Sequence, residues 1–233
     1  RRQRQMCIRD SNRPDMLTAV NEQLVWDLQK ATENVMNDDS VKVVILTGAG
    51  RGFSAGADLS ERKASWSGSK DALIRGSKPS FENIINMPKP VIASVPGPAA
   101  GIGAALAMSC DLRVMSEDSY LLSVFSNIAL VPDGGLSWFL PKFMGYAKAY
   151  EHAIEAKKIL ASDCLKYGIA NKVVPSDQLE QITLDWANQL AKRSSQSLNH
   201  TKRLMRESLA MSYWDTFSNE AEIQNELTVS DQN

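Results

Sequence analysis

The chain has 233 residues, which is long for one ordinary domain and short for two, so one domain with an added segment is expected. Its 26 basic and 27 acidic residues are balanced, which removes the electrostatic case for binding nucleic acid or an anionic membrane surface. The three cysteines are scattered and lack metal-ligand spacing. They predict a cytoplasmic protein with neither a disulfide framework nor a metal site.

The N-terminal part is predicted to contain a tail, a helix and a strand. Residues 1–11 show no hydrophobic period and no turn signal, so they are interpreted as a disordered or non-native tail. Residues 17–35 carry apolar side chains at steps of three and four, as on one face of a helix. Residues 41–47 are almost continuously apolar and β-branched, as in a strand buried on both faces. The polar residues 61–80 are interpreted as a mobile lid.

The uncharged stretch 91–110 imitates a membrane span. It contains Pro96, Pro98 and three glycines but few large aliphatic residues, so a buried strand, a tight turn and a buried helix are predicted instead. The elements that follow are short. They are predicted at residues 111–115 (strand), 136–144 (helix), 148–172 (a helix, then a short helix opened by Ser162) and 171–174 (strand). Helix and strand alternate up to residue 175, which predicts the α/β class.

The last part of the chain has no strand pattern. Ser176 is expected to cap a long helical segment, which is interpreted as a separate layer whose apolar face serves self-association. The chain is therefore divided into a tail at residues 1–11, a core at 12–175 and a helical oligomerisation region at 176–233.

Residues 52–56 match G-x-S-x-G, the nucleophile elbow of serine hydrolases. In such an elbow the serine directly follows a strand and has a histidine as its base. Here six residues separate Thr47 from Ser54, and His152 and His200 have the sequence context of surface or packing residues. The spacing therefore disfavours Ser54 as a nucleophile.

Two glycine-rich stretches, 48–56 and 97–103, each join a predicted strand to a following segment. Such loops can aim backbone N–H groups at an anion, and two donors that meet at one oxygen form an oxyanion hole. From the residues alone, two tight turns that pack alanine and glycine closely are an equally good interpretation.

Taken together, several stretches resemble the crotonase, or enoyl-CoA hydratase/isomerase, superfamily. They are residues 12–14, 51–59, 88–111, 130–135 and 159–175. The resemblance implies an α/β spiral of ββα units with a helical C-terminal trimerisation region. It also implies acyl-CoA substrates, with coenzyme A as part of the substrate and no separate cofactor, and a homotrimer or a dimer of trimers.

The resemblance implies an oxyanion hole made by the backbone N–H groups of Ala57 and Ile102. Ser54 then serves as a spacer in the loop that presents Ala57. The residues expected to line the coenzyme A site are Ser54, Ala55, Gly56, Ala57, Asp58 and Leu59.

The reaction implied by the resemblance depends on three positions. The two glutamates of a hydratase are replaced by Ala105 and Phe125, which cannot transfer a proton and predict an apolar acyl pocket. Asp133 lies in Val-Pro-Asp-Gly-Gly, which from the residues alone is ordinary turn chemistry. The resemblance implies instead the single catalytic carboxylate of an enoyl-CoA isomerase, in a motif similar to that of epoxyphenylacetyl-CoA isomerases. Asp58 and Asp111 are interpreted as structural.

Isomerisation needs one base, and an apolar pocket would raise its pKa by desolvation. An enoyl-CoA isomerase is therefore the expected function. A CoA thioester hydrolase, a ring-modifying enzyme and a catalytically silent acyl-CoA binder remain as alternatives.

Overall fold

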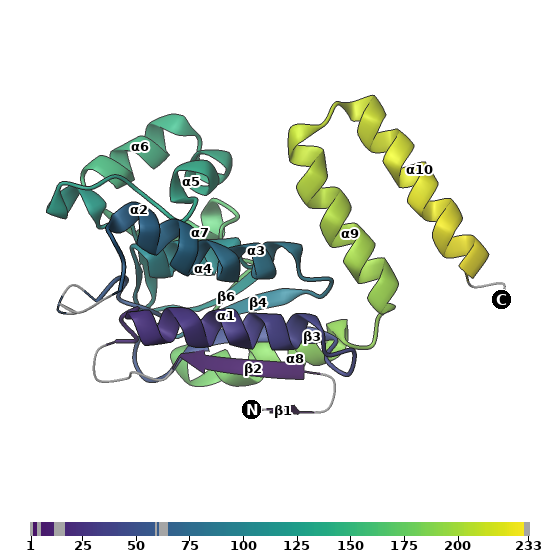
Figure 1. Cartoon of the computed structure of the whole chain (residues 1–233), viewed down its shortest axis with the longest axis horizontal. Coiled ribbons are helices and arrows are strands. Elements are labelled where there is room, and N and C mark those ends of the chain that lie inside the picture. The colour runs from purple at the N-terminus through teal and green to yellow at the C-terminus, as the bar shows by residue number, and fades with distance from the viewer. Residues whose placement is uncertain (1, 4–5, 12–16, 59, 61–64, 231–233) are drawn as a thin grey trace.

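The computed structural model of the chain describes residues 2–3, 6–11, 17–58, 60 and 65–230 (Figure 1). Their centre is a six-stranded sheet in the order β1-β2-β3-β4-β6-β9. These strands are β1 (Arg2–Gln3), β2 (Met6–Ser11), β3 (Val43–Gly48), β4 (Val91–Val95), β6 (Leu112–Ser116) and β9 (Lys172–Val174). In this sheet β2, β3, β4, β6 and β9 pair in parallel, and β1 pairs antiparallel with β2. The α/β class is confirmed.

A second sheet of three strands lies beside the first, in the order β5-β7-β8. Its strands are β5 (Ala99–Ala100), β7 (Tyr120–Leu122) and β8 (Lys158–Leu160). None of these strands was predicted, because each has only two or three residues and shows no period of its own. Strand β5 directly precedes helix α4 (Ile102–Ser109), so this small sheet fixes where α4 begins.

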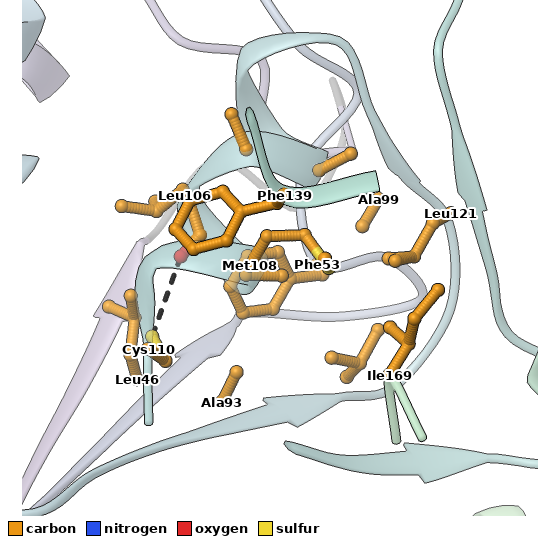
Figure 2. Close-up of a cluster of buried hydrophobic side chains, with 14 of the residues drawn as sticks. Leu46, Phe53, Ala93, Ala99, Leu106, Met108, Cys110, Leu121, Phe139 and Ile169 are labelled. Atoms are coloured by element: carbon orange, nitrogen blue, oxygen red, sulfur yellow. Dashed lines mark hydrogen bonds between the residues drawn. The ribbon is translucent and has the colours of Figure 1, made fainter. Parts of the chain in front are cut away.

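Alternate residues of β3 pack against different layers. Val44 and Leu46 belong to the larger core cluster, which includes side chains from α4 and from α5 (Leu136–Met144). Figure 2 shows this cluster around Phe53, Leu106 and Phe139. Val43 and Ile45 point to the opposite face, where they pack with Leu179 and Ala187 of α8 (Leu179–Leu190). Covering both faces explains why β3 is an almost continuous apolar run.

The remaining helical elements surround these layers or extend from them. They are α1 (Glu22–Met36), α2 (Ser69–Asp71), the π-helix η2 (Ala72–Ser77), α3 (Lys78–Asn86), the 3-10 helix η3 (Phe125–Ile128), α6 (Tyr146–Ile154), α7 (Ala161–Lys166), the 3-10 helix η4 (Ser176–Gln178), α9 (Ser195–Glu207), the 3-10 helix η5 (Ser208–Ala210) and α10 (Tyr213–Ser230). In Figure 1, α9 and α10 extend to one side of the sheet, and α5 and α6 lie above it. Within the described residues, no helix is both long enough and apolar enough to cross a membrane.

The interpretation of residues 1–11 as a disordered tail is wrong for residues 6–11. They form β2, which pairs with β3 from Met6 opposite Val43 to Ser11 opposite Gly48. The pairing completes the free edge of β3, a partner that is distant in the sequence and leaves no local periodic signal.

Three further predictions need correction. The lid proposed at residues 61–80 is helical from Ser69 onward, in α2, η2 and the start of α3, and residues 61–64 lie outside the described part. Ser176 does not cap α8, since its hydroxyl donates to Asp118 Oδ2 at 3.0 Å and α8 begins at Leu179. The helical region is also not one separate layer, because α8 packs on the sheet and only α9 and α10 stand away from it.

The placement of α8 predicts different costs for two leucine truncations. Leu179→Ala should lower the free energy of unfolding by about 2–5 kcal/mol, because a buried leucine leaves a cavity against β3. Leu209→Ala is the matched control, since Leu209 is exposed, and should change stability by about 0.5 kcal/mol or less in the isolated chain. Chemical denaturation measures both. Equal losses would contradict the assignment of α8 to the core.

Candidate active site

The loop that carries Ala57 is held by a parallel β-bridge to Val20. Val20 donates to Gly56 O at 2.7 Å and accepts from Asp58 N–H at 2.9 Å. In a parallel bridge, the residue between these two contacts directs its own N–H to the other side. Within the described part of the chain, the Ala57 N–H has no hydrogen-bond partner, and Ala57 is exposed.

A second unpaired donor lies at the start of α4. Gly101 precedes the helix with φ of 53°, donates to Leu122 O at 2.9 Å and accepts from Ala105 N–H at 3.1 Å. The first N–H groups of a helix have no intrahelical acceptor. The Ile102 N–H accordingly has no partner among the described residues.

The two segments that carry these donors touch at a pair of glycines. A Cβ added to Gly56, whose φ is +93°, would lie 2.9 Å from Ala100 O. A Cβ added to Gly101 would lie 3.8 Å from Gly56 Cα. Ala100 N–H also donates to Ser54 O at 2.8 Å, which ties the two loops together. The free N–H groups of Ala57 and Ile102 therefore belong to adjoining turns, an arrangement suited to binding one anionic oxygen.

Ser54 lies beneath this loop and not on its surface. It is buried, its hydroxyl donates to Thr18 O at 3.0 Å, and the same oxygen accepts from Gly56 N–H at 3.3 Å. A Cβ added to Gly103 would come within 2.5 Å of Ser54 Cβ, so the serine packs directly against α4. The ring of His152 contacts Lys157 O. This geometry suits a residue that holds the loop, as the spacer interpretation expects, and no histidine of the described part of the chain hydrogen-bonds the Ser54 hydroxyl.

Asp133 lies in the turn that leads into α5. Its carbonyl accepts from Leu136 N–H at 3.0 Å, and Gly134 and Gly135 have φ of 59° and 92°, values that favour glycine. Its Oδ1 is buried and has no hydrogen-bond partner within the described part of the chain. Burial raises the pKa of the Asp133 carboxyl to about 6, since the charged form loses contact with water.

The turn places Asp133 beside α4, through Gly134. A Cβ added to Gly134 would lie 2.5 Å from Ala105 Cβ and 2.7 Å from Ile102 Cδ1. Ala105 is fully buried under this turn, so a longer side chain at position 105 would collide with it. The small side chain of Ala105 therefore allows the turn that carries Asp133 to pack against the first turn of α4, next to the Ile102 side chain.

Phe125 lies close to Gly101, the residue before α4. It is buried, and its ring atom Cζ would be 3.8 Å from a Cβ on Gly101. Phe81 of α3 was not anticipated: its Cε1 would be 3.5 Å from a Cβ on Gly134. The interpretation of residues 61–80 as a lid hid the helical spacing that would have included it. Apolar side chains thus approach the turns at Gly101 and Gly134 from two directions.

The other predicted site residues have mixed placements. Ala55 is exposed and donates to Leu17 O at 2.9 Å, whereas Gly56 is buried. Asp58 Oδ1 accepts from Ser60 N–H at 3.1 Å and from Ser60 Oγ at 2.5 Å, as a structural turn residue does. Leu59 lies outside the described residues.

Comparison with known proteins agrees with this architecture. The family model for enoyl-CoA hydratase/isomerase matches residues 2–233. The chain belongs to the enoyl-CoA hydratase/isomerase family. The resemblance seen in the motifs, and the crotonase fold that it implied, are thereby confirmed.

Members of the enoyl-CoA hydratase/isomerase family with different names are similar to this chain. It is 33% identical to 1,2-epoxyphenylacetyl-CoA isomerase of Escherichia coli, over 82% of this chain and 75% of that protein. It is also 33% identical to a short-chain-enoyl-CoA hydratase of Clostridium acetobutylicum, over 82% of this chain and 74% of the relative. The crystal structure of an enoyl-CoA hydratase from a Polaromonas species matches with a TM-score of 0.90 at 27% identity, covering 97% of this chain and 89% of that one.

The contact between Gly134 and α4 predicts a specific effect of Gly134→Ala. The new methyl group collides with Ala105 and Ile102 and also requires a left-handed alanine, so the free energy of unfolding should fall by about 3 kcal/mol. Gly168→Ala is the matched control, because Gly168 has φ of +73° but no atom within 4 Å of an added Cβ. It should cost only the backbone strain, about 1–2 kcal/mol. Equal losses in thermal or chemical denaturation would contradict the proposed contact.

Proposed function

We propose that this chain is an enoyl-CoA isomerase that moves a carbon–carbon double bond of an acyl-CoA thioester, with Asp133 as its proton carrier. One observation carries the proposal: a partly buried carboxyl with an unpartnered oxygen and a pKa of about 6 lies in the turn packed on Ile102 and Ala105. A general base works best when its pKa is near the working pH.

The proposed reaction needs one base and one oxyanion site. Ionised Asp133 removes a proton from C2 of a 3-enoyl-CoA, and the electron pair delocalises into the thioester carbonyl to form a dienolate. The N–H groups of Ala57 and Ile102 donate to the negative oxygen. Asp133 then returns the proton to C4, the double bond moves from C3–C4 to C2–C3, and the carboxylate is regenerated. No cofactor takes part, and coenzyme A enters only as part of the substrate.

The proposal favours isomerisation over hydration because of the two substituted positions. The resemblance to the family implies that hydration of a double bond uses two glutamates, and the corresponding residues here are Ala105 and Phe125. Both are buried, and neither can hold a proton. The names of the relatives include hydratases, isomerases and a dehalogenase, so they support an acyl-CoA enzyme more broadly than they support one reaction.

Replacing Asp133 should remove turnover. Asp133→Asn keeps the size of the side chain but cannot accept a proton, so conversion of 3-enoyl-CoA to 2-enoyl-CoA should fall by roughly 10²- to 10⁴-fold. In the native protein kcat/KM should rise with pH through about 6 and then level off, because only the ionised carboxylate is active. Product chromatography over pH 4–9 measures both.

Ser54→Ala is the control for the hydrolase alternative. It removes two buried hydrogen bonds, the one to Thr18 O and the one from Gly56 N–H, which should cost about 1–3 kcal/mol of stability, and it should leave turnover almost unchanged. Free CoA as the product, with activity lost in Ser54→Ala, would support a thioester hydrolase instead. A native rate in folded Asp133→Asn would contradict the isomerase mechanism, and binding without any product would leave an acyl-CoA binder.

We also propose that the chain forms a homotrimer, or a dimer of trimers, through α9 and α10. These helices expose large apolar side chains, and Tyr213 and Trp214 are 71% and 72% exposed. The ring centroids of this pair are 5.0 Å apart, and both rings approach Phe217. An exposed aromatic cluster of this kind marks an interaction surface.

The free, buried thiols of Cys110 and Cys164 support a reducing compartment, and we propose the cytoplasm.

The assembly proposal predicts that Trp214→Glu weakens self-association. A charge in the aromatic cluster must be desolvated on assembly, so the dissociation constant should rise by about 10²-fold or more. Asn225→Glu is the matched control, because it adds the same charge to an exposed position of α10 outside the cluster. Light scattering across a dilution series measures both. A monomeric native chain, or equal effects of the two variants, would contradict the proposal.

A further inference from the structure

The carboxyl end of α4 is capped by side chains. The last four carbonyls of a helix lack intrahelical donors. Here Leu106 O accepts from Ser109 Oγ at 2.7 Å, and Ser109 O accepts from Arg206 at 2.9 Å. Ala107 O and Met108 O accept from Arg113 at 3.3 and 3.4 Å. All four carbonyls therefore have side-chain donors, whereas the Ile102 N–H at the other end is left unpaired among the described residues.

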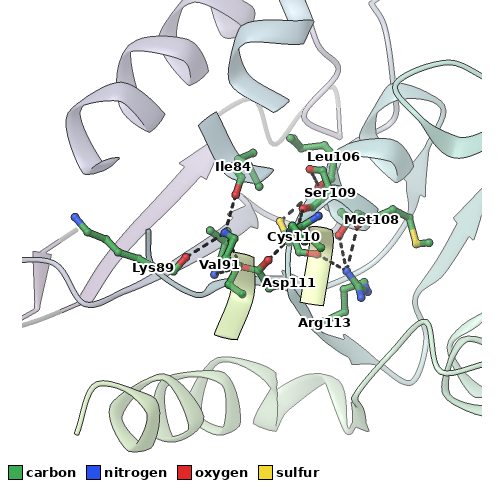
Figure 3. Close-up of polar contacts among 12 residues, drawn as sticks. Ile84, Lys89, Val91, Leu106, Met108, Ser109, Cys110, Asp111 and Arg113 are labelled. Carbon is green, nitrogen blue, oxygen red and sulfur yellow. Dashed lines mark hydrogen bonds and ion pairs between the residues drawn. The ribbon is translucent and has the colours of Figure 1, made fainter. Parts of the chain in front are cut away.

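Two of these donors are cations that reach α4 from different parts of the chain. Arg113 extends from β6, is almost fully buried, and also donates to Ile169 O and to Cys110 O, the latter at 2.8 Å. Figure 3 shows Arg113, Ser109 and Asp111 around this end of the helix. Arg206 comes from α9, about a hundred residues further along the chain. Its Nη2 bonds Ser109 O and, at 2.7 Å, Asp111 Oδ1.

Asp111 joins Arg206 to the rest of the core. Its second oxygen, Oδ2, accepts from Val91 N–H at 2.9 Å and forms an ion pair with Lys202 at 2.8 Å. Lys202, one turn before Arg206 on α9, donates to Ile84 O at 2.8 Å. Tail helix α9 is thus fixed to the ends of α3 and α4 through polar contacts that are largely shielded from water, where such bonds are strong.

We propose that Arg206 is a positioning residue for the oxyanion hole: it fixes the carboxyl end of α4, so that the placement of α9 determines where the Ile102 N–H lies. This inference rests on the proposed role of Ala57 and Ile102. It goes beyond that role because it assigns to Arg206 of α9, at the carboxyl end of α4, a part in positioning the oxyanion hole.

The physical link is the stiffness and burial of α4. The helix has eight residues and is therefore about 12 Å long. All eight residues are buried, so the helix has no exposed side toward which its residues could move independently of one another. A shift at Ser109 is therefore carried to Ile102. The cation at the carboxyl end also complements the helix dipole, whose positive end lies at Ile102. Loss of the Arg206 side chain should therefore weaken the hydrogen bond from the Ile102 N–H to a thioester carbonyl, although Arg206 itself does not contact the substrate.

The test measures polarisation of a carbonyl, which does not depend on proton transfer by Asp133. Butyryl-CoA labelled with ¹³C at its thioester carbonyl has no double bond to move, and hydrogen bonding displaces its resonance downfield. In Arg206→Met the displacement on binding should fall to about half or less, as expected when one of two oxyanion donors is misplaced. In the proposed isomerisation, kcat should fall roughly 10- to 10²-fold with little change in KM, the loss expected for a displacement of about 1 Å.

Arg203→Met is the matched control on the same helix. The Arg203 side chain is 52% exposed and faces Glu207, whereas that of Arg206 is 24% exposed. The control should retain the native ¹³C displacement and kcat. Arg206→Lys should restore most of both, because an ammonium group can still bond Ser109 O and Asp111. All variants are compared at the native oligomeric state, checked by light scattering.

Native ¹³C displacement in folded Arg206→Met, or an equal loss in Arg203→Met, would overturn the proposal. If Arg206→Met does not fold, Arg206→Ala decides: it removes both the donor and the charge and leaves room for water at Ser109 O and Asp111, and a native displacement there would equally overturn the proposal. Failure of the isomerase assignment looks different, since the native protein would then polarise butyryl-CoA yet leave 3-enoyl-CoA unchanged. A native protein that binds butyryl-CoA without any displacement would overturn the oxyanion hole itself.

Discussion

The close packing of α4 in the middle of the molecule is the constraint on which the candidate site depends. Gly103 meets Ser54 on one side of the helix and Ala105 meets the turn at Gly134 on another. Larger residues at these positions would push both loops outward. The run of small residues in α4 is therefore the condition for bringing a glycine loop, a helix N-terminus and a carboxyl together.

This packing also sets the electrostatics of the site. Among the described residues Asp133 Oδ1 has no hydrogen-bond partner, and burial of the carboxyl raises its pKa. The same shielding strengthens any hydrogen bond from a backbone N–H to a substrate oxygen. A partly buried carboxyl with one oxygen that lacks a hydrogen bond destabilises a fold, and natural proteins keep such groups chiefly where function needs them. The cost and the proposed chemistry thus arise from one cause.

The carboxyl-terminal helices are bound to this centre by charged side chains, and they expose apolar side chains to solvent. Lys202 and Arg206 point to Asp111 and are partly or largely buried, whereas Met205 and Leu209 on nearby turns are exposed. A helix that binds the core with one face and exposes apolar side chains on another can transmit to the core a shift caused by the binding of a second copy of the chain. In the proposed assembly, the surface that makes the trimer and the contacts that hold α4 therefore belong to the same helix.

The sequence by itself determined the elements whose signal is local. Hydrophobic period and turn chemistry predicted three of them. They are the β-branched strand β3, the uncharged stretch that forms β4, a turn and α4, and the glycine turn after Asp133. The family, and through it the candidate residues Ala57, Ile102 and Asp133, followed from motifs that occur together. Local period could not distinguish Asp133 as a turn residue from Asp133 as a base, since turn chemistry is the same in both.

Only the tertiary structure decided the features whose cause lies elsewhere in the chain. Residues 6–11 become a strand because β3 offers a free edge, and α8 joins the core because Val43 and Ile45 need covering. The pKa of Asp133 and the capping of α4 by Arg206 depend on neighbours distant in sequence. Pairing, burial and desolvation are properties of surroundings that the folded chain assembles, so no local pattern of residues can contain them.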